Sequence, residues 1–230
     1  MSKPIVRVTT IEAFRRFMTN SIERDYYEIT EQSVIDSITG KFKGNEYTRI
    51  GTAFHKIVEE GDMFLNYNPD SHGYDIEVDG NIVKFTMEQA RVALDYRDEH
   101  PEAFHEVRQY KDYGRAIVTG CADMLDGIEI RDIKTKYSQP KDENYIDSCQ
   151  WRYYLDIFNA DVFHFDLFIF EKYKKEKHGY DVRELELKRY TPPITCYRYP
   201  DMEADNIALL NAFMDFAESR GLIKYLKAVN

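Results

Sequence analysis

Residues 116–135 contain two strand patterns joined by a turn, and this pair limits the folds that are open to the chain. AIVTGCADML is apolar and rich in β-branched residues, while IEIRDIKT alternates apolar and polar residues with the period of a half-buried strand. Asp126-Gly127 lies between them and is a strong signal for a two-residue hairpin turn. The sequence therefore predicts an antiparallel hairpin here.

The length of this turn determines which residues face each other. It places Asp123 opposite Ile130. Because the side chains on one face of a sheet repeat every second residue, Asp123, Asp132 and Lys134 then project in the same direction. The two carboxylates become diagonal neighbours. A slip of one residue in the pairing would undo this arrangement, so the prediction depends on the turn.

The same face of the second strand is apolar at Ile128 and Ile130, so the charges occupy positions where the alternation predicts burial. One interpretation is that the strand runs into solvent, or contains a bulge, and carries a surface ion pair. The other is a metal site, because two carboxylates offer hard oxygen ligands to Mg²⁺ or Mn²⁺ and a nearby lysine stabilises an oxyanion or a water. The hairpin alone leaves both interpretations open.

Composition sets the broad class of the protein. The chain has 230 residues, of which 43% are hydrophobic and 31% are charged, as in a soluble globular protein of one domain. No apolar run approaches the roughly 20 residues that a membrane span requires, and the first ten residues lack the apolar core of a signal peptide. We therefore expect a cytoplasmic protein without membrane partners.

The cysteines exclude several kinds of site. Cys121, Cys149 and Cys196 are scattered and form no C-x-x-C motif. An odd number of cysteines without a signal peptide argues against a disulfide framework, and the missing motif argues against structural zinc. An iron–sulfur cluster needs four thiolates, so we expect none. The cysteines are predicted to be buried, reduced thiols.

The net charge of −10 argues against a protein that binds nucleic acid over its whole surface, but it leaves room for a local basic channel. Lysine and arginine gather in three segments, at residues 41–56, 131–141 and 172–177. The middle segment overlaps the charged hairpin. It is therefore the best candidate for such a channel.

The other patterns predict helices and strands in a mixed order. Helices are expected over residues 11–20, 22–38, 48–65, 86–100, 141–160 and 201–221, strands over 103–110, 115–124, 128–135, 161–172 and 180–190, and a hairpin over 74–85. This order predicts an α/β fold, with a mixed central β-sheet flanked by α-helices. No linker is evident, so one domain should span residues 1–230.

Two further groups of residues lie at helical spacing. Gly51, His55 and Glu59 are four residues apart and share one face of the helix expected over residues 48–65. Gln150 and Tyr154 are also four residues apart, on the helix after the charged hairpin. Alone, each group is ordinary: a single helical histidine is more often a packing or surface residue, and a Gln–Tyr pair is common on a partly buried helix.

Together these residues form four motifs in a fixed order: G-x-x-x-H-x-x-x-E, G-x-x-D, D-x-K-T and Q-x-x-x-Y, between residues 49 and 158. The pattern resembles the RecB-like exonuclease branch of the PD-(D/E)XK nuclease superfamily, and is similar to phage RecE-type and mitochondrial genome maintenance exonucleases. Ala122 stands where the name of the superfamily has proline, and Asp132 stands where glutamate is commoner. The resemblance implies a restriction-endonuclease-like core over residues 47–191, preceded by a helical part over 1–45 and followed by a helical extension over 199–230.

The resemblance also implies an activity and a set of roles. It implies a DNA exonuclease that hydrolyses phosphodiester bonds with Mg²⁺ or Mn²⁺. The implied metal ligands are the side chains of His55, Asp123 and Asp132 and the backbone carbonyl of Ile133. Lys134 would hold the attacking water and stabilise the charge that grows on the scissile phosphate. The residues implied around them are Gln150 and Tyr154, which would orient Lys134 or the phosphate, and Glu59 and Glu106, which would support the ligands or lie on the plain surface.

DNA is the substrate that the resemblance implies, in phage or bacterial recombination, repair or replication. Lys136 continues the strand face of Asp132 and Lys134, and Lys141 lies just beyond, so these two lysines are expected to bind phosphates. The nearby rings of Tyr137 and Trp151 are expected to stack on bases of a single strand, which favours cutting from an end.

Several alternatives stay open at this point. One is a structure-specific or restriction-type endonuclease, and another is a catalytically silent subunit that binds nucleic acid. A recombination or single-strand-binding partner protein and a homo-oligomer are also open. The chain contains no G-x-x-x-x-G-K-[ST] motif, so no ATP-driven motor is expected within it.

Overall fold

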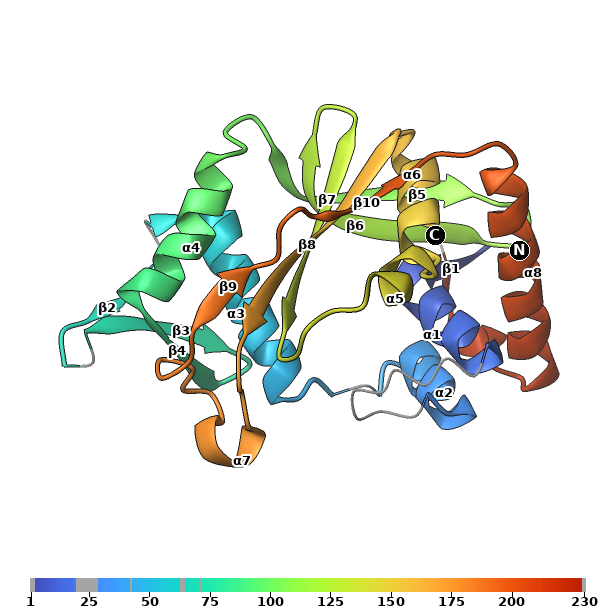
Figure 1. Ribbon diagram of the computed structural model, residues 1–230. Coiled ribbons are helices and arrows are strands. Elements are labelled where there is room, and N and C mark those ends of the chain that lie inside the picture. The colour runs from blue at the N-terminus through green and yellow to red at the C-terminus, as the bar shows by residue number, and fades with distance from the viewer. Residues whose placement is uncertain (1–2, 20–28, 42, 63–64, 71, 229–230) are drawn as a thin grey trace.

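The computed structural model describes residues 3–19, 29–41, 43–62, 65–70 and 72–228, and Figure 1 shows their arrangement. The helices are α1 (Val8–Met18), α2 (Glu31–Thr39), α3 (Glu46–Glu60), α4 (Met87–Asp98), α5 (Asp142–Ile146), α6 (Gln150–Phe158), α7 (Lys175–His178) and α8 (Met202–Ser219), followed by a 3-10 turn at Ile223–Tyr225. The strands are β1 (Pro4–Arg7), β2 (Tyr67–Asn68), β3 (Gly73–Val78), β4 (Asn81–Thr86), β5 (Phe104–Asp112), β6 (Ile117–Asp126), β7 (Glu129–Lys136), β8 (Val162–Phe170), β9 (Leu187–Arg189), β10 (Ile194–Tyr197) and β11 (Lys227–Ala228).

Most of these strands form one mixed sheet. Its order is β10-β8-β7-β6-β1-β11, with β5 paired to β6 and β9 paired to β8. The pairs β7–β8 and β1–β6 are parallel and the other neighbours are antiparallel. Strands β2, β3 and β4 form a separate small sheet. The predicted α/β fold, with a mixed central sheet flanked by helices, is confirmed.

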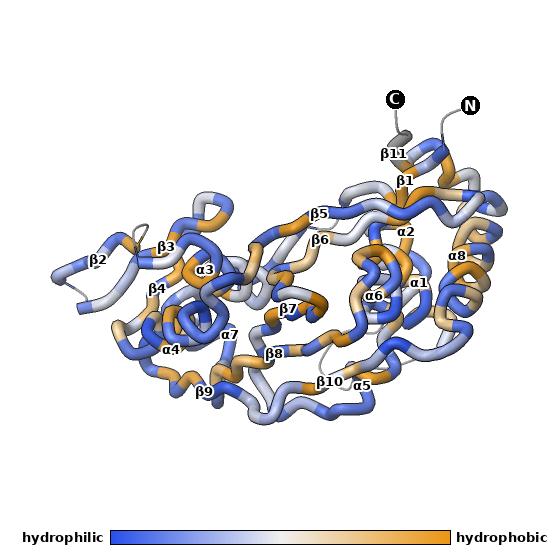
Figure 2. The backbone as a smooth tube through the Cα atoms, turned by 90° about the horizontal axis from the view of Figure 1, so that it is seen from above, coloured by the Kyte–Doolittle hydropathy of each residue, from blue (hydrophilic) through white to orange (hydrophobic). Residues whose placement is uncertain are grey.

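Two hydrophobic clusters lie against the central sheet. One contains residues of α1, α6 and α8 together with β1, β6 and β8, and the other contains residues of α3, α4, β3 and β4 together with β7 and β8. Figure 1 shows the two groups of helices on opposite sides of the central strands, and Figure 2 shows the same division from above. Strand β7 contributes Ile130 to the first cluster and Ile133 to the second, so it lies between them.

Local sequence signals explain the ends of the helices. Helices α3 and α4 both begin at a capping box, in which the side chains of Asn45 and Thr86 accept hydrogen bonds from backbone N–H groups of the first turn. Helix α3 ends at Gly61, whose φ of 75° suits glycine better than other residues. The helix expected over residues 48–65 therefore runs from Glu46 to Glu60. Within the described residues, no helix is both long enough and apolar enough to cross a membrane.

Two predicted segments differ from the structure. The helix expected over residues 141–160 is divided into α5 and α6, and between them the hydroxyl of Ser148 accepts a hydrogen bond from the N–H of Gln150. The strand expected over residues 180–190 is reduced to β9. A turn precedes it, in which the N–H of Leu185 donates to the carbonyl of Val182 at 2.9 Å.

Strand β1 and helix α2 also differ from the predicted elements. Strand β1 was not expected, because four residues are too few to show a period. Of the helix expected over residues 22–38, residues 22–28 lie outside the described residues, and α2 begins at Glu31 behind the cap residue Thr30.

The hairpin predicted within residues 116–135 has its turn one residue later than predicted. Asp126 pairs with Glu129, so the two loop residues are Gly127 and Ile128 instead of Asp126 and Gly127. Gly127 has a φ of 61°, and a glycine at the first loop position is a known solution for two-residue hairpins. The turn moves by one position on both strands, so each side chain keeps the face that was predicted. Asp132 becomes directly opposite Asp123 instead of diagonal to it.

A buried ion network joins β8 to the strands and the helix around it. Asp166 is 1% exposed and accepts hydrogen bonds from the hydroxyl of Tyr96 at 2.8 Å and from Arg131 at 3.1 Å. Arg189 lies 3.5 Å from its other oxygen. The carboxylate compensates the charge of two guanidinium partners in a buried place, and its removal leaves the cations without compensation.

Replacement of Asp166 by alanine should therefore lower the free energy of unfolding by about 3–5 kcal/mol. Urea denaturation followed by circular dichroism measures this value. Asp95→Ala is the matched control, because the Asp95–Arg91 pair on α4 is 56% and 74% exposed and should contribute less than about 1 kcal/mol. Equal losses for the two variants would show that the buried network does not stabilise the fold.

Candidate metal centre

Regular strand pairing fails at one row of the central sheet. The β5–β6 ladder pairs the residues on either side of Glu106 and Asp123 but omits that pair. The β6–β7 ladder ends one position before Asp132 would oppose Asp123. Three acidic residues on three adjacent strands thus share one row, and their strands are not joined by regular backbone pairing there.

At this row a side chain replaces one of the missing backbone hydrogen bonds, and the backbone of Glu106 is strained. The N–H of Ile133 donates to the Asp123 carboxylate at 2.7 Å, so a side chain takes the position that a backbone carbonyl of β6 would have in a regular ladder. Glu106 has a φ of 51°, a left-handed value that is unfavourable for a residue other than glycine. Such strain persists only where the surrounding structure maintains it, and it is often found at functional sites.

Helix α3 brings His55 to this row. Nε2 of His55 lies 2.8 Å from the carbonyl oxygen of Ile133, and because a carbonyl only accepts, Nε2 carries the proton. Nδ1 is on the other side of the ring and lies 3.7 Å from Oδ1 of Asp123. Gly51 permits this approach, since a Cβ at that position would lie 3.0 Å from the hydroxyl of Thr135 on β7.

His55, Glu106 and Asp123 form a cluster that could hold a metal ion. One potential ligand atom from each residue lies within 4.8 Å of the others. A histidine that binds a metal commonly donates its other N–H to a carbonyl or carboxylate, and the bond from His55 to Ile133 has this form. Two carboxylates and one imidazole, without a thiolate, are a donor set for a hard or intermediate divalent cation.

Asp132 and Lys134 form the adjacent half of the site. Asp132 is 2% exposed, and its Oδ2 lies 2.6 Å from Nζ of Lys134. Its Oδ1 accepts a hydrogen bond from Nε2 of Gln150, the first residue of α6, at 3.1 Å. Oδ2 makes no hydrogen bond of suitable angle within the described chain, although it is buried. One oxygen of Asp132 is therefore held by the protein, and the other faces the ammonium group alone.

Tyr154 fixes strand β6 beside the acidic row. Its hydroxyl donates to the carbonyl of Cys121 at 2.9 Å, and its ring lies over Gly120. A Cβ at Gly120 would come within 3.2 Å of the ring, so a larger residue would displace the tyrosine. The G-x-x-D and Q-x-x-x-Y motifs thus meet in space. Tyr154 is bonded to the backbone of β6 and not to Lys134, one of the two partners that the resemblance implied; its role toward the phosphate stays a prediction.

The electrostatics of the row follow from burial. Burial raises the pKa of Asp123 to about 6; His55 opposes the shift and the nearby Asp132 carboxylate adds to it. Burial alone would lower the pKa of Lys134, but the carboxylates of Asp132 and Asp123 outweigh it and raise that pKa above its ordinary value. Lys134 therefore stays a cation at neutral pH, which suits it to stabilise negative charge.

Glu59 and Glu106 were not distinguished by sequence, and the structure separates them. Glu106 belongs to the cluster with His55 and Asp123, while Glu59 is exposed on α3. Partial burial, followed by the nearby carboxylate of Glu106, raises the pKa of Glu59. A signal for Glu106 was present: antiparallel pairing of the strands expected over 103–110 and 115–124 places Glu106 opposite Asp123 in the register that the structure has.

The two aromatic residues expected to stack on bases are placed otherwise. Trp151 is 8% exposed and donates from its indole N–H to the carbonyl of Ile146. Tyr137 packs against the rings of Tyr47 and Tyr173 and donates its hydroxyl to the carbonyl of Tyr47. Both rings already have protein on their faces or edges. This packing was not evident from their proximity in sequence to the charged strand, and stacking of these rings on bases stays a prediction.

The expected lysines lie on the side of α5. Nζ of Lys136 is 5.3 Å from the centre of the Tyr145 ring, a cation–π distance. Lys141 is exposed at the residue before α5. Both positions are accessible from the end of β7, and their binding to DNA stays a prediction.

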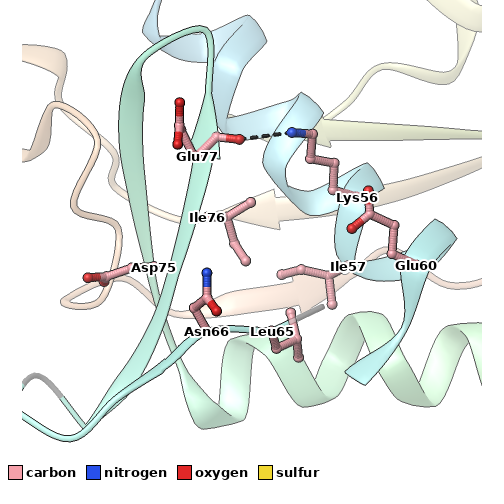
Figure 3. Close-up of a pocket in the computed structure, with 8 residues that line it drawn as sticks. All are labelled: Lys56, Ile57, Glu60, Leu65, Asn66, Asp75, Ile76 and Glu77. Carbon is pink, nitrogen blue, oxygen red and sulfur yellow. Dashed lines mark hydrogen bonds between the residues drawn. The ribbon is translucent and has the colours of Figure 1, made fainter. Parts of the chain in front are cut away.

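A separate hollow lies between α3 and β3. Its volume is about 110 Å³, and Lys56, Glu60 and Glu77 are among its lining residues. Figure 3 shows the hollow with the hydrogen bond from Lys56 to the carbonyl of Glu77. It contains none of the predicted site residues, and its apolar floor is formed by Ile57 and Ile76. We assign it no role in the candidate centre.

No protein-family model matches the chain, and no curated protein matches it. Among solved structures, a protein from Eubacterium rectale described as "Putative exonuclease" has a TM-score of 0.49 at 12% identity, over 96% of this chain and 82% of that chain. A protein described as "SSO0001" has a TM-score of 0.42 at 14% identity, over 95% and 79% of the two chains. At these values neither similarity assigns a function.

The raised pKa of Asp123 predicts a stability effect in the metal-free protein. The ordinary pKa of aspartate is about 3.9, so above about pH 6 the fold bears the full cost of an ionised carboxylate, and the cost disappears as the pH falls toward 4. Asp123→Asn keeps an acceptor for the N–H of Ile133. It should raise the melting temperature in EDTA at pH 7 and have little effect near pH 4.

Differential scanning calorimetry at the two pH values measures this effect. Asp98→Asn, at an exposed position of α4, controls for the loss of one negative charge from an acidic protein. An unchanged or lower melting temperature for Asp123→Asn at pH 7 would show that the carboxylate is not strained by its burial.

The cluster also predicts which glutamate binds metal. Addition of MnCl₂ should raise the melting temperature of the wild-type protein, because an ion that binds only the folded state stabilises it. Glu106→Gln should weaken the affinity for Mn²⁺ by at least about tenfold, since a neutral amide oxygen replaces a carboxylate ligand. Glu59→Gln, one of the uncertain positions, should keep the wild-type affinity. The reverse order of the two variants, measured by isothermal titration calorimetry, would refute the assignment.

Proposed function

We propose that the protein is a divalent-metal-dependent deoxyribonuclease that degrades DNA from its ends. The observation that carries the proposal is the acidic row at the break in the sheet, where His55, Glu106 and Asp123 gather beside the Asp132–Lys134 pair. An ammonium group two residues after a buried carboxylate, next to a cation site, is suited to phosphodiester hydrolysis.

The residues of the site divide the work between them. His55, Glu106 and Asp123 would hold Mg²⁺ or Mn²⁺, which when bound supplies a more acidic water and compensates charge on the phosphate. Lys134 contributes a fixed positive charge for the oxygens of the scissile phosphate. Asp132 holds the Lys134 ammonium at 2.6 Å, and Gln150 holds Asp132, so the cation is oriented before substrate arrives.

We further propose that the chain belongs to the RecB-like branch of the PD-(D/E)XK superfamily. The support is that its four motifs meet in space: Gly51 lies against Thr135, Gly120 lies under Tyr154, and Lys134 lies beside Asp132. In this proposal residues 47–191 form the nuclease core. The proposal includes Asp132 and the Ile133 carbonyl as further ligands of the ion. In the structure Asp132 contacts Lys134, and the Ile133 carbonyl accepts a hydrogen bond from His55.

DNA is the proposed substrate, with Lys136 and Lys141 as contacts for phosphates beyond the cleavage site. In a protein with a net charge of −10, such contacts have to be local, so affinity should depend strongly on salt. Recombination, repair or replication is the proposed setting, and a single-strand-binding or recombination protein is a plausible partner in it. An endonuclease and a catalytically silent subunit are the alternatives that the next experiment separates.

The test is digestion of end-labelled linear DNA and of covalently closed circular DNA, each with Mg²⁺, Mn²⁺ or EDTA. Linear DNA should be degraded in either metal, closed circles should be spared, and EDTA should stop the reaction. Lys134→Ala should lower the rate by about 10²–10³-fold, because a charge that stabilises the transition state is removed. Lys224→Ala, an exposed lysine after α8, should behave as wild type.

Three other outcomes would change the proposal in different ways. Rapid nicking of closed circles would favour the endonuclease. Metal binding without turnover on any substrate would favour the silent subunit. A Lys134→Ala variant that keeps a tenth of the wild-type rate would contradict the role given to that residue.

A further inference from the structure

Strand β5 carries Glu106 to the metal centre and continues beyond it as an exposed strand. Glu106, Arg108 and Tyr110 occupy alternate positions and are all exposed, with Tyr110 at 54%. Among the described strands β5 pairs only with β6, so its outer edge is open. In Figure 2 no helix or strand lies outside β5 along this stretch. We propose that this surface guides a single strand of nucleic acid to the metal centre, with Arg108 on a phosphate and Tyr110 stacked on a base.

The other side of β5 faces the protein, which fixes the direction of the exposed residues. Val107 pairs with Ala122 of the first hydrophobic cluster, and Nζ of Lys111 lies 2.7 Å from Asp156 on α6. Val107 and Lys111 therefore point toward α6, while Gln109 between them is exposed. Arg108 and Tyr110 lie between Val107 and Lys111 in the sequence. They point to the opposite side of the strand, where solvent reaches them.

Glu106 lies on this same side despite its unusual backbone. The thiol of Cys121 is 3.3 Å from Oε2 of Glu106, and Cys121 is the residue that pairs with Arg108. Directly paired residues share a face of the sheet, so Cys121 and Arg108 project together and the Glu106 carboxylate reaches their side. The proposed strip is thus continuous from the metal ligand to Arg108 and Tyr110.

The charge of the strip is complementary to a phosphate. Within the described part of the chain, Arg108 forms no ion pair and no side-chain hydrogen bond, whereas Arg115 nearby is paired with both Asp215 and Glu218. An exposed guanidinium group offers a planar set of donors that matches a phosphate. The net charge of −10 disfavours phosphate over most of the surface. A phosphate held by Arg108 would instead lie close to the three carboxylates and the metal that they would hold.

The spacing fits a nucleic-acid strand. Two residues of a β-strand advance about 7 Å, so Arg108 lies about that far along the strand from Glu106, and Tyr110 about twice as far. A stacked strand advances about 3.4 Å per nucleotide, which places these residues about two and four nucleotides from the cleavage site. Stacking on tyrosine accepts any base but needs an unpaired one, so the strip selects a single strand or a frayed end.

The basic segment at residues 172–177 is less suited to this role. A hollow beside α7 is lined by Lys172, Lys174 and Lys177, but Glu171, Glu184 and Glu186 line it as well. Lys177 is already paired with Glu184 at 2.8 Å. The positive charge there is largely balanced, and the hollow includes none of the residues of the metal centre.

The proposal is tested by binding of a fluorescent twelve-nucleotide oligothymidine, measured by anisotropy in EDTA so that no cleavage occurs. Arg108→Ala and Tyr110→Ala should each weaken binding by about 5–100-fold, the range expected for loss of one stacked base or one phosphate contact. Tyr110→Phe should restore most of the affinity, because the ring and not the hydroxyl stacks. A duplex of the same length with blunt ends should bind more weakly than the single strand.

Two variants serve as matched controls. Tyr197→Ala removes an exposed tyrosine of β10, which is 64% exposed, and Arg91→Ala removes an exposed arginine of α4. Both should bind as wild type, and the melting temperatures of all variants should agree, since every substituted side chain is exposed. In cleavage assays with Mn²⁺, Tyr110→Ala should raise KM by a larger factor than it lowers kcat.

The inference rests on the proposed nuclease function, but the two fail in different ways. If the wild-type protein cleaves DNA and the Arg108 and Tyr110 variants bind and cleave normally, the strip is refuted and the nuclease stands. If the oligonucleotide binds in an Arg108- and Tyr110-dependent manner and no metal supports cleavage, the strip stands as a binding surface and the nuclease is refuted. Equal effects of Tyr197→Ala and Tyr110→Ala would also refute the strip.

Discussion

The hydrogen bond from the N–H of Ile133 to the Asp123 carboxylate is the interaction on which the candidate centre depends. In a sheet with regular pairing, that N–H would donate to a backbone carbonyl of β6. The Asp123 carboxylate would then not be held between the two strands. The carboxylate instead ends the β6–β7 ladder and leaves its second oxygen beside His55. Backbone that is freed from pairing has to find other partners, and here the partners are the groups that form the site.

Much of the fold follows from local sequence. The α/β class, the mixed sheet and the positions of β5, β6, β7 and β8 follow from alternation and turn residues. The turn of the hairpin was predicted one residue early, because Asp-Gly is the commoner signal and the structure places Gly127 first in the loop. The predicted side-chain faces survive that error, since both strands shift together.

The site was predictable where its residues lie close together in sequence, and less so where they do not. Asp132 and Lys134 are two residues apart, and their proximity needs only a strand. Glu106 joins the cluster through the pairing of two expected strands, whose register the sequence leaves open, and through a left-handed backbone conformation that no local pattern indicates. Trp151 and Tyr137 show that proximity in sequence does not determine exposure: they are near the charged strand, but packing on α6 and against other aromatic rings decides how much of each ring is exposed.

The position of β7 between two hydrophobic clusters has a consequence for when the candidate centre can form. His55 is fixed by the cluster around α3, while Gln150 and Tyr154 are fixed by the cluster around α6. A chain in which only one of these cores has formed holds half of the groups and cannot assemble the rest. The candidate centre therefore assembles only when both hydrophobic cores have formed, so an emerging or partly unfolded chain would not bring His55 and Gln150 to the same acidic row.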